Sequence, residues 1–181
     1  MSASTPSARF AFQLQRNPAL LCSTSSRHIS TKREHQMSVR FNPKGMWEPN
    51  GRAFSQGVVQ GDGRILHITG QVAWDANSHI VGVGDVGAQF EKCIENTRRV
   101  LAEVGGELDD IVSLTVYFTN RESLPVIQNV RASHFRTATA PASILILVPG
   151  LVLPEFLIEI VPIAVILQKR FRDPDVNNIA V

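Results

Sequence analysis

The sequence predicts an α+β domain in which two helices pack on one face of a mixed sheet. Three observations support this class. Apolar residues recur every three or four positions in residues 86–104, as on one face of a helix. In residues 110–119 they alternate with polar residues, as in a strand with one buried side. A second helical segment separates that strand from two further apolar strands at residues 142–148 and 156–167.

The part before the first helix is expected to hold a hairpin. Residues 39–50 are interrupted by proline and glycine, so they should be extended and loop-like. Residues 54–60 and 64–72 are rich in strand-forming residues, and a Gly61-Asp62-Gly63 turn joins them. We therefore expect these two strands to pair with each other.

The ends of the first helix and the buried side of the following strand are also predicted. Asp85 has the residue type preferred at a helix start, and Gly105-Gly106 provides a stop. The strand face expected to be buried carries Val112, Leu114, Val116 and Phe118.

Prolines define the last third of the chain. Pro125 lies in the first turn of a helix that should run to about residue 136. Pro149-Gly150 turns the chain between the last two strands. Pro162 lacks a backbone donor, so we expect an edge strand or a bulge there. Residues after 169 are polar and should be frayed.

Composition limits the class of protein. The 181 residues are 44% hydrophobic and 19% charged, with a net charge of +2, which suits one globular domain. So small a charge does not favour nucleic acid as a partner, and no apolar run is long enough for a membrane span. Cys22 and Cys93 show neither metal-ligand spacing nor a disulfide framework, which favours a reducing compartment.

Residues 1–36 differ from the rest. Up to residue 33 they contain five basic residues, many serines and no acid, which is typical of a mitochondrial transit peptide. This predicts a protein of the mitochondrial matrix. The alternative is a disordered leader, or translation from Met37, which would leave the protein in the cytoplasm. The folded domain is expected at residues 37–168, followed by a polar tail at 169–181.

Glu159 is a single carboxylate inside the apolar run of residues 156–164. A charge in a low-dielectric core is costly, so it must be paired, neutralised or used. Together with Pro141-Ala142-Ser143, this run resembles the closing signature of the RidA/YjgF family, which includes RutC. Phe54-Ser55-Gln56-Gly57, the run from Ile68 to Val72, and Glu95-Asn96 resemble earlier family motifs in the same order, so the resemblance spans residues 41–168.

The resemblance implies a chorismate-mutase-like fold and a homotrimer with ligand clefts between subunits. It implies hydrolysis of enamine or imine intermediates to a 2-oxo acid and ammonia, with neither metal nor organic cofactor. In the family, an Arg after Pro-Ala grips the substrate carboxylate, and a Glu of the last strand positions the attacking water. By this correspondence Glu159 is the catalytic residue, and Gly70 lies in a substrate-binding motif.

The chain departs from the family at the cleft. Ser143 replaces the Arg, Phe54 replaces a Tyr, and Gln128 stands where Asn is frequent. A guanidinium binds a carboxylate bidentately, whereas a serine hydroxyl offers one neutral hydrogen bond. The usual imino-acid deaminase activity is therefore in doubt. Arg52 and Arg131 are possible substitute cations near the cleft.

The first functional hypothesis is a hydrolase of a small imine, enamine or related carbonyl metabolite that has no carboxylate to clamp. Glu159 would orient water, while Ser143 and the Leu145 backbone would hold the substrate in a largely apolar pocket. The alternatives are a non-catalytic trimeric small-molecule-binding or protein-interaction module, and a tailoring protein of a specialised-metabolite pathway. The hydrolase hypothesis requires Glu159 to face the same cleft as Ser143.

Overall fold

The computed structural model describes residues 36–175, so the expected transit peptide and the last residues of the tail lie outside it. In chain order its elements are β1 (Val39–Phe41), β2 (Gly57–Val59), β3 (Arg64–His67), α1 (Val86–Glu103), β4 (Ile111–Phe118), α2 (Leu124–His134), β5 (Ala142–Leu147) and β6 (Ile158–Ile166), with 3-10 turns at Leu108–Asp110 and Arg121–Ser123. No helix in this part of the chain is long and apolar enough to cross a membrane.

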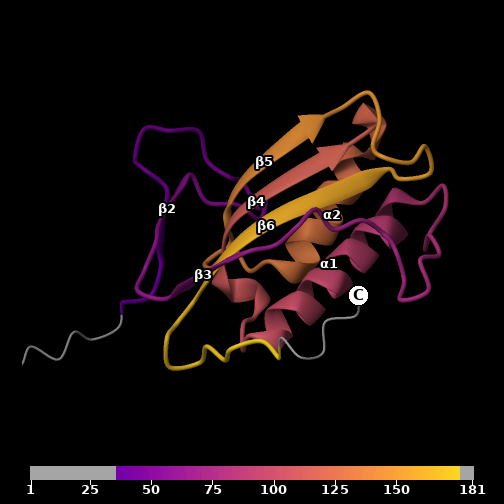
Figure 1. The fold of residues 1–181 in the computed structure, drawn as a ribbon. Helices are drawn as coiled ribbons and strands as arrows, with labels where there is room; N and C mark the ends of the chain where they lie inside the picture. Colours follow the sequence, from indigo (N-terminus) through magenta and orange to yellow (C-terminus); the bar gives the residue numbers. More distant parts are fainter. Residues whose placement is uncertain (1–35, 176–181) are drawn as a thin grey trace, which may run out of the picture. The chain divides into compact units, whose positions relative to one another are not determined.

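The four-stranded sheet has the order β3-β6-β4-β5. β4 and β5 run parallel, whereas β6 is antiparallel to both of its neighbours. Both helices lie on the same face of this sheet (Figure 1). The predicted α+β class, with two helices on one face of a mixed sheet, is confirmed.

The predicted hairpin is wrong. β2 pairs with β1 in a separate two-stranded sheet, with Arg40 opposite Val58, and β3 pairs with β6, with Leu66 opposite Ala164. The turn at Pro149-Gly150 does not make a hairpin either, because β4 lies between β5 and β6. The alternation of apolar and polar residues identifies a strand but not the strand that it pairs with. β6 is a central strand that pairs along both edges, so β3 pairs with β6 rather than with β2.

Two strand details also differ from expectation. Val112 is not on the buried face, because a bulge between Ile111 and Ser113 shifts the register of β4. Pro162 lies in a central strand rather than at an edge. Its carbonyl accepts a hydrogen bond from Ile68 N (3.3 Å), so its nitrogen faces the point where β3 ends and needs no ladder partner.

The helices begin and end as their sequences predict. The Asp85 carboxylate accepts hydrogen bonds from two backbone amides of the first turn of α1, and Gly105 adopts a positive φ of +76° after its end. α1 buries Phe90, Ile94 and Leu101 against the sheet. This packing makes the helix face of the sheet the core of the domain.

The expected fraying after residue 169 is contradicted for Arg170–Arg172. Arg172 N donates to Val104 O (3.1 Å), and Arg170 forms an ion pair with Asp110. Phe171 lies under the Arg64 guanidinium. The start of the tail therefore packs against the C-terminal end of α1.

Candidate functional site

A cleft of about 320 Å³ lies beside the edge strand β5. Four of the predicted site residues meet there: Phe54, Gln128, Ser143 and Leu145. The cleft is lined by Trp47, Arg52, Phe54, Ser55, Gln56, Ser113, Gln128, Ala142, Ser143, Ile144 and Leu145. Trp47 was not predicted as a cleft residue. Its position shortly before the Phe54 motif was the only indication in the sequence that it could lie there.

Buried hydrogen bonds fix the wall of this cleft that carries Phe54. Arg131 Nη2 donates to Ala53 O (2.8 Å), which ties the segment to α2. Ser55 Oγ donates to Ala140 O (2.8 Å) and Ser55 N donates to Pro141 O (3.0 Å), which ties it to the start of β5. The wall is thus held from two sides before any ligand arrives.

Ser143 lines the cleft, but its hydroxyl proton is already used. Ser143 Oγ donates to Leu114 O at 2.9 Å. Because a hydroxyl has one proton and two lone pairs, Ser143 can accept a hydrogen bond from a ligand but has none left to donate. It therefore cannot replace an arginine that grips an anion.

The Leu145 backbone faces away from the sheet. Pro141 O bonds outward to Ser55 N, whereas Val148 N donates inward to Phe118 O (2.9 Å). Backbone groups alternate in direction along a strand, so the N–H and C=O of Leu145 point outward, to the same side as the Pro141 carbonyl. They are available to a ligand at the edge of the sheet.

The floor of the cleft is polar and only partly satisfied. Gln128 Oε1 is buried with no hydrogen-bond partner among the described residues. One helical turn later, Arg131 is fully buried, and its Nε and Nη1 also lack partners in this part of the chain. Burial lowers the pKa of the Arg131 guanidinium to about 10, so it stays protonated at neutral pH.

Within one chain, Glu159 is not in this cleft. Ser143 lies in register with Leu114, which is in turn opposite Pro162, so Glu159 is two strands away and three residues further along. Those spacings amount to roughly 14 Å between Cα positions, and an odd number of residues puts the two side chains on opposite faces. A single chain therefore does not bring Glu159 and Ser143 into the same cleft.

Glu159 instead lies on the open face of the sheet together with Gly70. It is half-buried, opposite Tyr117 of β4, and no described residue donates a hydrogen bond to its carboxylate. A Cβ on Gly70 would overlap Glu159 Oε1. The absence of a side chain at Gly70 therefore gives the carboxylate its position. Structure brings these two predicted residues together, away from the other four.

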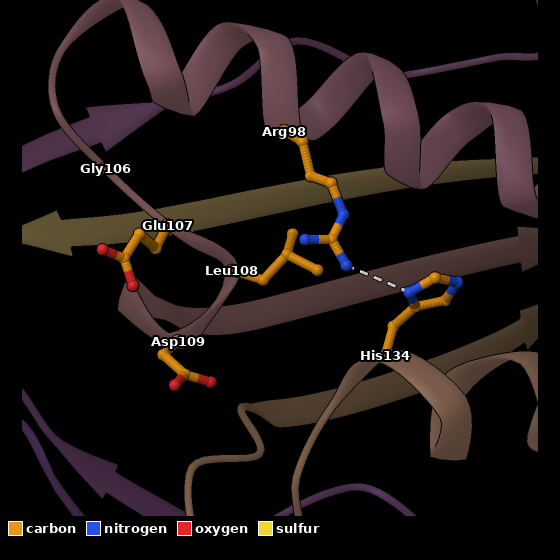
Figure 2. Close-up of a pocket in the computed structure, with 6 residues that line it drawn as sticks. All are labelled: Arg98, Gly106, Glu107, Leu108, Asp109 and His134. Carbon is orange, nitrogen blue, oxygen red and sulfur yellow. Dashed lines mark hydrogen bonds between the residues drawn. The ribbon is translucent and has the colours of Figure 1, made fainter.

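A larger hollow of about 400 Å³ lies between the two helices and contains none of the predicted residues (Figure 2). Its charged groups bind one another. Arg98 Nη2 lies 3.1 Å from His134 Nδ1, and His134 Nε2 lies 2.6 Å from Glu91 Oε2. Asp109 is likewise engaged by Arg136 and Thr139. With its polar groups already satisfied, this hollow is a weaker candidate than the cleft beside β5.

The described residues contain no group of three or more His, Cys, Asp or Glu side chains placed to hold a metal ion. The groups available at the two regions include the Glu159 carboxylate, amide and hydroxyl groups and backbone donors. They also include the exposed guanidinium groups of Arg52 at the cleft and of Arg99 in the hollow that Gly70 lines.

Comparison with known proteins agrees with the fold. Residues 48–166 match the family described as Endoribonuclease L-PSP, which is two thirds of the chain. The chain belongs to the RidA/YjgF/RutC family. It is similar to 3-aminoacrylate deaminase RutC of Acinetobacter baylyi, with 33% identity over 100 residues, 55% of this chain and 78% of RutC.

Solved structures of Rid proteins from Yersinia pestis are also similar. YyfB, a protein of unknown function, is 36% identical, with a TM-score of 0.68 over 72% of this chain and 100% of YyfB. YyfA is 25% identical, with a TM-score of 0.53 over 71% of this chain and 99% of YyfA. Family membership and fold are thereby established, whereas the roles of individual site residues depend on the geometry above.

Proposed function

We propose that this protein hydrolyses small imines or enamines in a cleft completed by two copies of the chain. One copy supplies the shaped cleft beside β5, and its neighbour supplies Glu159 over Gly70. The observation that carries the proposal is the half-buried Glu159 carboxylate, which accepts no hydrogen bond from a described residue and occupies the space left by the missing side chain of Gly70. The deaminase name of the RutC relative supports the reaction type.

The chemistry needs only water and proton transfers. An enamine first tautomerises to an imine, as one N–H proton leaves nitrogen and a proton is added to carbon. Glu159 accepts a proton from water as the water oxygen bonds to the imine carbon, and this proton passes to the nitrogen to give a carbinolamine. The hydroxyl proton of the carbinolamine then passes through Glu159 to the departing nitrogen as the C=O bond forms. The C–N bond breaks, and one imine plus one water gives one carbonyl compound and one ammonia.

A second copy is needed because the parts are separated within one chain. The open face of the sheet, opposite the helices, displays apolar side chains that a partner could cover. Ile65 is 51% exposed and Ile144 is 59% exposed. Exposed apolar residues on one sheet face favour association, and a homotrimer would repeat each cleft around a closed ring.

Ammonia release tests the hydrolase directly. Imines generated in situ by an amino-acid oxidase should lose ammonia faster with the protein than without it, and Glu159→Gln should remove the acceleration. Glu155→Gln is the matched control, since Glu155 is an exposed carboxylate just before β6. No acceleration over a panel of imines, or an unchanged rate in Glu159→Gln, contradicts the proposal.

The loss of the family Arg favours a second candidate, a small-molecule-binding module that uses the same cleft without turnover. In that case metabolites would raise the thermal unfolding midpoint while none is consumed. Stabilisation combined with ammonia release would exclude this candidate.

A further inference from the structure

Among residues 36–175, Arg52 is the only charged side chain that lines the cleft beside β5. None of the described residues that line it is acidic. A single guanidinium in an otherwise neutral, partly apolar hollow creates a positive potential with nothing inside the cleft to neutralise it. The charge thus comes from the segment before β2, not from β5, where the family places its arginine.

The Arg52 side chain is held in a fixed orientation. Its Nε donates to Pro49 O (2.8 Å) and its Nη2 donates to Glu48 O (3.3 Å). The guanidinium carbon lies 5.4 Å from the centre of the Trp47 ring and 5.9 Å from that of Phe54. Contacts of this kind reduce the motion of a long side chain before a ligand binds.

One edge of the guanidinium remains open. The contacts to the two carbonyls use Nε and one hydrogen of Nη2, and Nη1 has no acceptor among residues 36–175. The hydrogens left on Nη1 and Nη2 form a planar pair that matches the two oxygens of a carboxylate. Arg52 therefore offers the bidentate donor that Ser143 lacks.

The backbone beneath Arg52 is equally fixed. Its neighbour Ala53 is 2% exposed and accepts the hydrogen bond from the fully buried Arg131. Arg131 does not line the cleft, so it supports the wall and adds positive charge behind it. The two arginines considered from sequence thus have different places: Arg52 lines the cleft, whereas Arg131 lies under it.

We infer that Arg52 is the anion-recognising residue of this cleft, and that the natural ligand is a small organic carboxylate with an apolar substituent. Trp47, Phe54 and Leu145 provide the apolar surface for that substituent. The inference builds on the proposed function in taking this cleft as the substrate site. It replaces the substrate expected from the sequence, which has no carboxylate, with a substrate that carries one.

Binding of a matched pair of probes tests this role. The full-length protein is titrated calorimetrically with 2-oxobutanoate and with 2-oxobutanamide, which has a similar shape but no charge. Wild-type protein should bind the acid at least about tenfold more tightly, because charge-assisted bidentate bonds are stronger than neutral ones. Arg52→Gln should lose that preference, and Arg52→Lys should keep part of it.

Arg64→Gln is the matched control. Arg64 also stacks on an aromatic ring, with its guanidinium carbon 5.0 Å from the centre of the Phe171 ring, but it lies outside the cleft. The Arg64→Gln variant should bind both probes with the same affinities as the wild type. The unfolding midpoint of Arg52→Gln should match that of Arg64→Gln, which shows that the fold is intact.

Equal affinity of the wild type for acid and amide overturns the inference, as does an unchanged preference in Arg52→Gln. The ammonia assay separates this result from the hydrolase proposal. Loss of the preference in Arg52→Gln with no ammonia release keeps the anion site and rejects the hydrolase. Ammonia release with no effect of Arg52→Gln on binding keeps the hydrolase and rejects the role of Arg52.

Discussion

The two regions that carry the predicted site residues are incomplete in opposite ways. The cleft beside β5 has a preformed wall, outward backbone groups and a guanidinium, but no acid lines it. The region around Gly70 has an unbonded carboxylate on the open face of the sheet. Each contains what the other lacks, and strand β4 separates them.

This difference explains why residues that resemble one family site do not form one site in a single chain. The tertiary fold places the side chains of Ser143 and Glu159 on opposite faces of the sheet and two strands apart. The proposed hydrolysis therefore requires assembly, in which a second copy would bring its Glu159 to the cleft. The variants below test each region separately.

The largest effect is expected for Glu159→Gln. The amide keeps the size of the side chain but cannot accept a proton, so imine hydrolysis should fall by about 10²- to 10⁴-fold. Thermal unfolding should change little, since no described residue hydrogen-bonds to the carboxylate. Ammonia release measures the hydrolysis rate, and a thermal unfolding curve measures the stability. A rate within twofold of wild type would remove Glu159 from the chemistry.

Gly70→Ala should have the next largest effect. The new methyl group would overlap Glu159 Oε1 and displace the carboxylate, which should lower the rate by about 10²-fold. Stability should fall by less than about 1 kcal/mol, because a flexible side chain can move. Gly150→Ala is the control, as a Cβ there meets nothing within 4 Å. Equal rates for the two variants would contradict the role of Gly70.

Ser143→Ala should have a small effect on both readouts. It removes the hydrogen bond to Leu114 O, which should reduce the free energy of unfolding by about 1 kcal/mol. The hydrolysis rate should change by only a few-fold, since Ser143 does not carry the anion contact. A fall as large as that of Glu159→Gln would make Ser143 a direct participant.

The smallest effect is expected for the ionisation of Cys93, a buried core residue whose pKa is also affected by Glu159 on the open face. Burial first, and the Glu159 charge second, raise the pKa of the Cys93 thiol to about 12. The folded thiol stays protonated while the unfolded one ionises, so this contribution to stability is full below about pH 9 and is lost between about pH 9 and 12. Peptide-resolved alkylation at pH 9 should therefore modify Cys93 only on unfolding. Rapid alkylation of the folded protein would contradict its burial.

Local patterns predicted the helices, the strand before α2 and the capping residues, because these depend on neighbouring residues. They did not predict that β2 pairs with β1 or that Val112 lies in a bulge, because pairing depends on distant strands. Phe54, Gln128, Ser143 and Leu145, which the resemblance singled out, line one cleft, whereas Gly70 lies beside Glu159. The separation of Glu159 from these four residues was not predicted, since strand order and facing decide it.

Subunit complementation tests the shared cleft most directly. Glu159→Gln lacks the acid and Ser143→Phe fills the cleft, so each should be inactive alone. Co-expressed in equal amounts and purified without separating mixed oligomers from uniform ones, they should recover about a quarter of the wild-type rate. Half of the acids and half of the clefts are intact, so random assembly joins two intact parts at about one site in four. Mixed oligomers with no recovered activity would contradict a site built from two copies.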